Sequence, residues 1–233
     1  MKKFGLSRVE IGLWLGSVLL ILFSFLMFDR ESFLTLAASL IGVTSLIFNA
    51  KGNPIGQVLM IVFSLLYGII SFSFRYYGEM LTYLGMTMPM AVVALVSWLR
   101  HPFQGSRSEV KINRLTRREL LFMCLISLPV TALFGVLLAR LETSNLFFST
   151  LSVTTSFLAV YLTFRRSAWF GMAYAANDVV LLILWSMASI TDSSYFSVVA
   201  CFAAFLANDL YGFFCWRKRR TQQAIIANDH LHS

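Results

Sequence analysis

Eight long apolar segments constrain this chain more than any other feature of its sequence. A helix that crosses about 30 Å of hydrocarbon, rising about 1.5 Å per residue, needs about 20 apolar residues. Segments of this kind occupy residues 11–28, 33–49, 55–74, 79–99, 118–139, 143–164, 168–190 and 194–216. We therefore predict an all-α polytopic membrane protein with about eight transmembrane helices.

The composition supports a membrane fold over a soluble one. Of the 233 residues, 58% are hydrophobic and 13% are charged, whereas a soluble domain carries about 25% charged residues. The cysteines Cys124, Cys201 and Cys215 all lie in apolar segments and lack CxxC spacing. Neither a disulfide framework nor a metal site is predicted, and no cofactor is expected.

Positive charge is distributed unevenly between the loops. With the N-terminus placed inside the cell, 16 of the 19 Lys and Arg residues lie on the cytoplasmic side. The other side keeps Arg30, Arg75 and Arg140, each near an acid, as Arg75 is near Glu79. The positive-inside rule then predicts that both termini and the loop 100–117 are cytoplasmic. Because this rule accounts for the net charge of +8, the lipid bilayer is the expected partner and nucleic acid is not.

The order of the spans predicts two parallel three-helix repeats joined by one linker helix, a 1+3+1+3 arrangement. The stretch 39–48 (SLIGVTSLIF) aligns with 149–158 (STLSVTTSFL). The linker helix restores the orientation, so both repeats begin outside and end inside, as in SWEET-type carriers. The predicted domains are an extra N-terminal helix (1–32), the first repeat (33–99), a cytoplasmic loop and linker helix (100–142), the second repeat (143–220) and a cytoplasmic tail (221–233).

An Asn-Asp pair occurs twice inside apolar runs, as Asn177-Asp178 and as Asn208-Asp209. These acids are predicted to be the only ones deep within a span, and no Lys, Arg or His is predicted at their depth. A carboxylate at the bilayer centre costs about 2.5–3.5 kcal/mol, so a partner, water or a cationic ligand must compensate. We interpret the pairs as functional, and the alternative is that they only hold helices together.

Polar and aromatic side chains share helix faces with these pairs. A cavity that combines acids, amides and aromatic rings suits a planar, polar, cationic ligand, because the rings stack on it and attract its charge. A further polar stripe runs along the third span. The candidate substrate-binding residues on these faces are Gln57, Ser64, Tyr67, Tyr174, Asn177, Asp178, Trp185, Asn208, Asp209 and Tyr211.

Four short motifs resemble the PnuC family of bacterial vitamin transporters. They are AKGN (50–53), LLYGIISF (65–72), YYGEM (76–80) and NDLYGFFCW (208–216), and the resemblance covers about residues 35–220. It implies a SWEET-like fold in the bacterial inner membrane and facilitated diffusion of nicotinamide riboside. It also implies that a cytoplasmic kinase is the functional partner and traps the substrate by phosphorylating it. A homo-oligomer is compatible with this interpretation.

One departure from the family pattern bears on the substrate. Family members that carry nicotinamide riboside often show W-x-x-W near the start of the penultimate helix. Here Trp169 matches the first tryptophan and is therefore a further candidate substrate-binding residue, but Met172 stands at the second position. The expected substrate is therefore nicotinamide riboside or a related small vitamin or nucleoside, with thiamine or riboflavin as alternatives. Nicotinamide riboside and thiamine are cations, so Asp178 or Asp209 could face their charge.

Two other hypotheses follow from the buried acids. Asp178 and Asp209 could form the dyad of an intramembrane aspartyl protease, in which two carboxyl groups share a proton. The chain lacks the Gly-x-Gly-Asp setting of such proteases, so we do not expect an enzyme. Buried acids also relay protons, which makes a proton-coupled carrier the third hypothesis.

Overall fold

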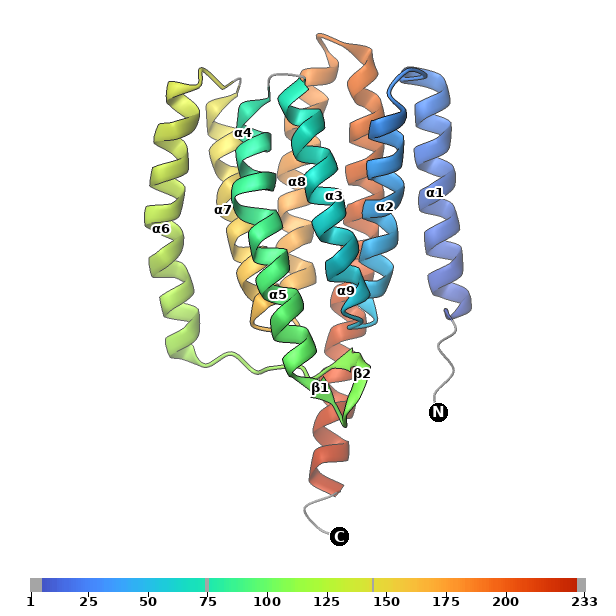
Figure 1. Ribbon diagram of the computed structural model, residues 1–233, viewed down its shortest axis with the longest axis vertical. Helices are drawn as coiled ribbons and strands as arrows, with labels where there is room; N and C mark the ends of the chain where they lie inside the picture. Colours follow the sequence, from blue (N-terminus) through green and yellow to red (C-terminus); the bar gives the residue numbers. More distant parts are fainter. Residues whose placement is uncertain (1–5, 74–75, 144, 230–233) are drawn as a thin grey trace.

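Long helices run up and down between the two ends of one bundle in the computed structural model, which describes residues 6–73, 76–143 and 145–229 (Figure 1). The elements are α1 (Arg8–Phe28), α2 (Phe33–Ala50), α3 (Ile55–Ser73), α4 (Tyr77–Met80), the π-helix η1 (Leu81–Thr87), α5 (Met88–Arg100), β1 (Pro102–Phe103), β2 (Ser106–Val110), α6 (Arg117–Arg140), α7 (Leu146–Phe164), α8 (Phe170–Ser189), the 3-10 helix η2 (Ser193–Tyr195) and α9 (Phe196–Asp229).

The predicted all-α fold with eight membrane-spanning segments is confirmed by helices that are long and apolar enough to cross a bilayer. Two details differ from the prediction. The fourth span is a composite of α4, η1 and α5, and Pro89 stands in the first turn of α5. Because proline donates no N–H and crowds the preceding turn, it favours a widened helix there. The last helix continues to Asp229 and so takes in most of the predicted tail, whose last residues lie outside the described range.

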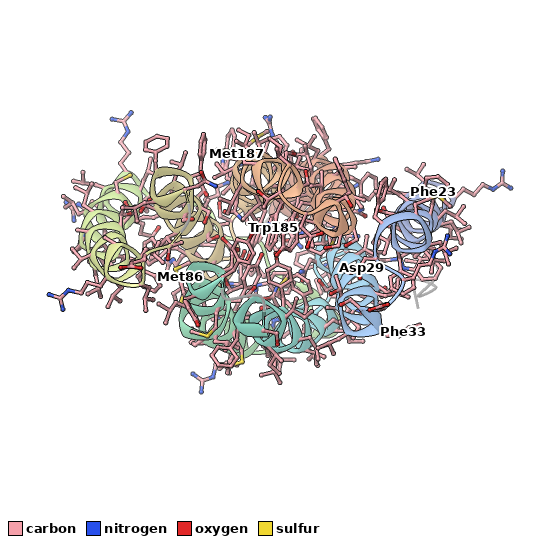
Figure 2. All side chains as sticks on the ribbon, turned by 90° about the horizontal axis from the view of Figure 1, so that it is seen from above. Phe23, Asp29, Phe33, Met86, Trp185 and Met187 are labelled. Carbon is pink, nitrogen blue, oxygen red and sulfur yellow. The ribbon has the colours of Figure 1, made fainter. Side chains whose placement is uncertain are left out.

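Helices α1 and α6 flank the bundle (Figure 1). In their apolar stretches only 22% and 11% of the residues are buried, against 33% to 56% in the other six spans. Figure 2 shows Phe23 of α1 on the rim and Trp185 of α8 near the middle. The interior is therefore built from α2, α3, the composite fourth span, α7, α8 and α9.

The start of α1, the end of α9 and the β1–β2 hairpin lie at the same end of the bundle, here called the hairpin end (Figure 1). The opposite end is called the far end. Both α1 and α6 begin at the hairpin end with a capping box, in which Ser7 pairs with Glu10 and Thr116 with Glu119. Such boxes satisfy the free N–H groups of the first turn. The positive-inside rule predicts that these same segments, the two termini and the loop 100–117, lie on one side of the membrane.

Two turns at the hairpin end share one backbone conformation. Gly52 after α2 has a φ of 68°, and Arg166 after α7 has a φ of 55°. In each turn the N–H of the next residue donates to the carbonyl five residues before it, at 3.0 and 2.9 Å. Matching Gly52 to Arg166 shifts the alignment of 39–48 with 149–158 by one helical turn. The ends of α2 and α7 are thus equivalent in local structure.

Two tryptophans at the hairpin end form reciprocal hydrogen bonds. Trp98 of α5 donates from Nε1 to the carbonyl of Thr163 in α7 at 3.0 Å. Trp216 of α9 donates to the carbonyl of Asn49 in α2 at 2.7 Å. The two rings lie 5.3 Å apart, and Phe170 lies 4.7 Å from Trp216. We call Trp98, Phe170 and Trp216 the hairpin-end cluster, which fills the interior at that end.

Candidate functional site

A small cavity lies inside the bundle between the two ends. About 20 Å³ of it is open to a water-sized sphere, which is room for about one water molecule. Five α-helices and the π-helix η1 contribute to its wall. The lining residues are Leu46, Met60, Phe63, Tyr83, Thr87, Ser156, Tyr174, Asn177, Asp178, Phe202, Phe205 and Asp209.

Two carboxyl groups meet in this cavity. Asp178 of α8 and Asp209 of α9 are 2% and 4% exposed and lie close enough to interact directly. No ion pair among the described residues involves either acid, and Asp178 Oδ2 has no hydrogen-bond partner. Two negative charges placed together away from water repel each other. The pair therefore favours a positive species beside it, either a proton or a cationic ligand.

Asn177 presents its amide to the same cavity. Its Oδ1 accepts hydrogen bonds from Thr155 at 2.8 Å and from Ser156 at 2.9 Å, both on α7. These bonds fix the amide orientation, and within the described chain its Nδ2 donates no hydrogen bond. An oriented amide N–H₂ can donate to a carbonyl or hydroxyl of a ligand.

Asn208 does not take the equivalent place. Its Nδ2 donates to Ser17 Oγ on α1 at 2.9 Å and to the carbonyl of Ala204 at 2.7 Å. Asn208 is absent from the cavity lining, whereas its neighbour Asp209 belongs to it. A step of one residue rotates a side chain by about 100° around a helix. Asn208 thus joins α9 to α1, and the two Asn-Asp pairs have different surroundings.

Aromatic side chains close the interior at the far end. Trp185 lies 4.9 Å from Tyr76, 5.5 Å from Tyr195 and 6.3 Å from Tyr67, measured between ring centroids. We call these four residues the far-end cluster. Within the part of the chain that the structure describes, the Tyr67 hydroxyl, the Trp185 indole N–H and the buried Ser64 hydroxyl have no hydrogen-bond partner. The predicted residues Ser64, Tyr67 and Trp185 are therefore buried polar groups in the interior but do not line the cavity.

Three other predicted site residues lie toward the hairpin end. Gln57 donates to Asn49 Oδ1 at 2.8 Å, and Tyr211 is only partly buried. Trp169 is 48% exposed and its ring is 5.3 Å from that of Phe213. None of the three lines the cavity. Among the predicted residues, the cavity brings together Tyr174, Asn177, Asp178 and Asp209.

Glu79 is a buried acid that the sequence analysis placed at the outer surface. It is 3% exposed, its Oε1 accepts a hydrogen bond from Ser152 at 3.4 Å, and its Oε2 has no hydrogen-bond partner among the described residues. Asp178 and Asp209 are thus not the only buried acids, although Glu79 lies only two residues from the start of its span, Tyr77–Arg100. The expected neighbour Arg75 lies outside the described residues. The signal that could have found Glu79 is its spacing of four and eight residues from the cavity residues Tyr83 and Thr87.

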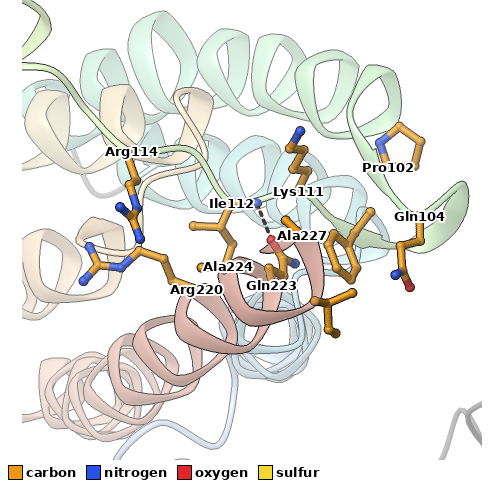
Figure 3. A pocket seen from close by; sticks show the side chains of 11 residues that line it. Pro102, Gln104, Lys111, Ile112, Arg114, Arg220, Gln223, Ala224 and Ala227 are labelled. Atoms are coloured by element: carbon orange, nitrogen blue, oxygen red, sulfur yellow. Dashed lines mark hydrogen bonds between the residues drawn. The ribbon is translucent and has the colours of Figure 1, made fainter. Parts of the chain in front are cut away.

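A second hollow opens on the surface at the hairpin end, between the hairpin and α9 (Figure 3). Its lining includes Lys111, Arg114 and Arg220, and an adjoining hollow shares Arg114 and Arg220 and includes Trp169. This basic groove is separate from the central cavity, because no residue lines both. Trp169 therefore belongs to the surface of the hairpin end.

Comparisons with known proteins agree with this architecture. The sequence profile of the family described as nicotinamide mononucleotide transporter matches residues 32–218, most of the chain. The chain belongs to this family. The nicotinamide riboside transporter PnuC of Neisseria mucosa is 24% identical over 195 residues, which cover 82% of this chain and 74% of that protein. The crystal structure of the vitamin B3 transporter PnuC superposes with a TM-score of 0.82 at 22% identity, covering 94% of each chain.

Membership of the PnuC family settles two of the hypotheses. The predicted resemblance is confirmed, and the chain is a transporter of a multi-pass membrane family rather than an enzyme. The aspartyl protease hypothesis for Asp178 and Asp209 is thereby dismissed, although the structure does bring the two carboxyl groups together.

Proposed function

We propose that this protein carries nicotinamide riboside, or a closely related small vitamin or nucleoside, across the membrane by facilitated diffusion. The observation that carries the proposal is the meeting of Asp178 and Asp209 in a buried cavity, with no cationic side chain of the described residues in its lining. The pyridinium ring of nicotinamide riboside supplies a positive charge, and aromatic neighbours such as Tyr174 attract cations. The Asn177 amide would donate to the carboxamide or a ribose hydroxyl.

The closure of the cavity at both ends supports alternating access as the proposed mode of transport. The hairpin-end cluster and the far-end cluster each fill the interior with aromatic rings. Because the cavity holds about one water molecule, a vitamin enters only after one cluster separates. In the proposed cycle the two clusters open in turn, and the substrate is exposed to one side at a time.

The two parallel three-helix repeats of the sequence analysis remain part of the proposal. Two observations support them: the equivalent turns at Gly52 and Arg166, and the reciprocal bonds of Trp98 and Trp216. In each bond the third helix of one predicted repeat donates to the first helix of the other. Such a pair of bonds is what an axis along the membrane normal would generate.

Glu79 extends the proposed path toward the far end. From Glu79 to Tyr83 is one helical turn, and its partner Ser152 is one turn from Ser156, so the carboxyl lies about 6 Å outward of the cavity wall. The far end is proposed to face outward, because the positive charges gather at the hairpin end. A cation entering from outside would then pass Glu79 before it reaches Asp178 and Asp209.

Uptake into proteoliposomes that contain the purified protein tests this proposal. Nicotinamide riboside should equilibrate without ATP, sodium or a proton gradient, and should accumulate only when a riboside kinase and ATP are enclosed. Thiamine and riboflavin, supplied in parallel, test the alternative substrates. A panel of apparent unfolding temperatures with each compound gives a second readout, since a ligand that binds the folded state stabilises it. Equal behaviour of protein-containing and empty vesicles toward all compounds would refute the proposed function.

A proton-coupled carrier is the second candidate, and the adjacent carboxyl groups of Asp178 and Asp209 favour it. A proton could neutralise the pair whenever the substrate is absent. An imposed pH gradient then discriminates between the two candidates. It drives concentrative uptake of unmodified substrate in a coupled carrier and leaves the final level unchanged in a facilitator.

A further inference from the structure

The basic groove at the hairpin end is large enough to hold a small molecule. Its volume is about 580 Å³, and the adjoining hollow adds about 410 Å³. Small-molecule sites in proteins typically measure about 300–1,000 Å³. The groove walls come from the hairpin, from the segment that follows it and from the part of α9 beyond the bundle (Figure 3).

Cationic groups converge at one end of this groove. Figure 3 shows Arg114 and Arg220 next to each other and Lys111 further along the wall, and both arginines also line the adjoining hollow. No acidic residue of the described chain lines either hollow. Like charges brought together without a counter-ion repel each other, so an anion bound between Arg114 and Arg220 would relieve the repulsion.

Neighbouring arginines at the same end behave differently. Arg165 pairs with Glu119, and Arg219 lies 3.3 Å from Glu109. Lys111, Arg114 and Arg220 form no ion pair with any described residue. The positive-inside rule explains why cations are frequent at this end, but it does not require three of the unpaired ones to line one groove.

The groove is held in shape by hydrogen bonds across it. Gln223 of α9 accepts from the N–H of Ile112 at 2.9 Å and donates to the carbonyl of Val110 at 3.1 Å. Its Nε2 also lies 3.1 Å from Glu109 Oε1. These bonds fix the hairpin and its following segment against α9. A preformed site loses less entropy when a ligand binds.

We propose that this groove binds the phosphate group of an organic phosphate, held by Arg114 and Arg220 with Lys111 in support. Guanidinium groups match phosphate oxygens with paired N–H donors. The rest of the lining is mainly apolar and includes Phe103, Ile112 and Ala224, so the remainder of the ligand is apolar or aromatic. An anionic phospholipid headgroup and a soluble nucleotide both carry this chemistry, and basic sites at the cytoplasmic membrane face recognise lipid phosphates.

Binding measurements on the full-length protein in nanodiscs test the proposal and separate the two sources. One arm adds adenosine monophosphate to discs of phosphatidylcholine, and the other replaces part of the phosphatidylcholine with phosphatidylglycerol. Each arm measures affinity at low and at high salt, since interactions between exposed charges weaken as salt screens them. Arg114→Gln/Arg220→Gln is the groove variant. Arg117→Gln/Arg118→Gln is the matched control, because it removes two exposed cations from the same end outside the groove.

The expected result is binding in one arm, a loss of at least tenfold in the groove variant and an unchanged affinity in the control. Binding of adenosine monophosphate would identify the ligand of the groove as a soluble phosphate ester. A response to phosphatidylglycerol alone would identify it as a lipid headgroup. Lys111→Gln gives a smaller loss and serves as a second variant if the double variant folds poorly. Binding in neither arm overturns the proposal, as does an equal loss in the groove and control variants. Neither outcome depends on which vitamin is carried.

Discussion

Asp178 of α8 and Asp209 of α9 bring their carboxyl groups together in one buried cavity, although 30 residues separate them along the chain. The helices that carry them are antiparallel and packed against each other. The contact therefore links the last two spans at the cavity that we propose as the substrate site. An arrangement of two acids without a cation stabilises the folded protein poorly, and its retention is understandable if it serves transport.

Replacing either acid by asparagine should stabilise the protein while weakening the binding of a cationic substrate. Asp209→Asn removes one of two repelling groups, and each kcal/mol gained raises the apparent unfolding temperature of a chain of this size by about 2–4 °C. The same change should lower the affinity for nicotinamide riboside at least tenfold, which corresponds to about 1.4 kcal/mol. Thermal unfolding and equilibrium binding on one preparation measure both effects. A variant that is less stable and binds normally would show that the acid pair is structural.

The two asparagines should respond differently to the same substitution. Asn177→Leu removes an oriented amide from the cavity, so binding should fall at least tenfold in a protein that still folds. Asn208→Leu breaks the bond to Ser17 on α1, and hydrogen bonds between membrane helices average about 0.6 kcal/mol. Its effect should be a small loss of stability with normal binding. Ser17→Ala is the matched control and should reproduce Asn208→Leu; loss of binding in Asn208→Leu alone would contradict the assignment of Asn208 to the α1 contact.

The sequence predicted the spans and the acid pair well, because both depend on local or simple information. An apolar run identifies a span wherever its neighbours lie, and equal depth on antiparallel helices predicts that Asp178 and Asp209 meet. The hydrogen bond of the Asn208 side chain to α1 was not predictable from the sequence. It depends on where α1 packs, and α1 lies outside the predicted repeats. Gln57 was predicted from the polar stripe of the third span and Trp169 from the W-x-x-W motif. Both lie toward the hairpin end, Trp169 as the residue that precedes α8.

Two boundaries illustrate a further limit of hydropathy. A hydropathy profile shows where the apolar run of α9 ends, but contacts decide where the helix ends. The bonds of Gln223 to Ile112 and Val110 extend α9 beyond the bundle. Similarly, the span that begins at residue 79 placed Glu79 at the membrane surface. The preceding turn, α4, is already helical and turns Glu79 toward the interior.

Cysteine labelling tests the orientation proposed for the two ends. The hairpin end is expected to be cytoplasmic, so a cysteine placed at Ser106 in the hairpin should be protected from an impermeant reagent added outside intact cells. A cysteine at Asp192, between α8 and η2 at the far end, should react. The described native cysteines include the exposed Cys124, so a background without cysteines is the proper control. Reaction at Ser106 with protection at Asp192 would invert the topology.

The last prediction concerns Glu79, the acid on the far-end side of the cavity. If it receives the positive charge of an entering substrate, Glu79→Gln should raise the KM for uptake of nicotinamide riboside at least tenfold. The glutamine keeps the shape and can still accept the bond from Ser152. Uptake of the uncharged dihydro form of the same riboside should be unaffected, because this form carries no positive charge for Glu79 to attract.

Glu31 is an exposed acid at the far end, so Glu31→Gln controls for the general surface potential. Arg75→Gln tests the alternative of an ion pair, and it should leave the KM unchanged. Equal effects of Glu79→Gln on the charged and the uncharged form would assign the carboxyl to helix packing with Ser152 instead of to the substrate path.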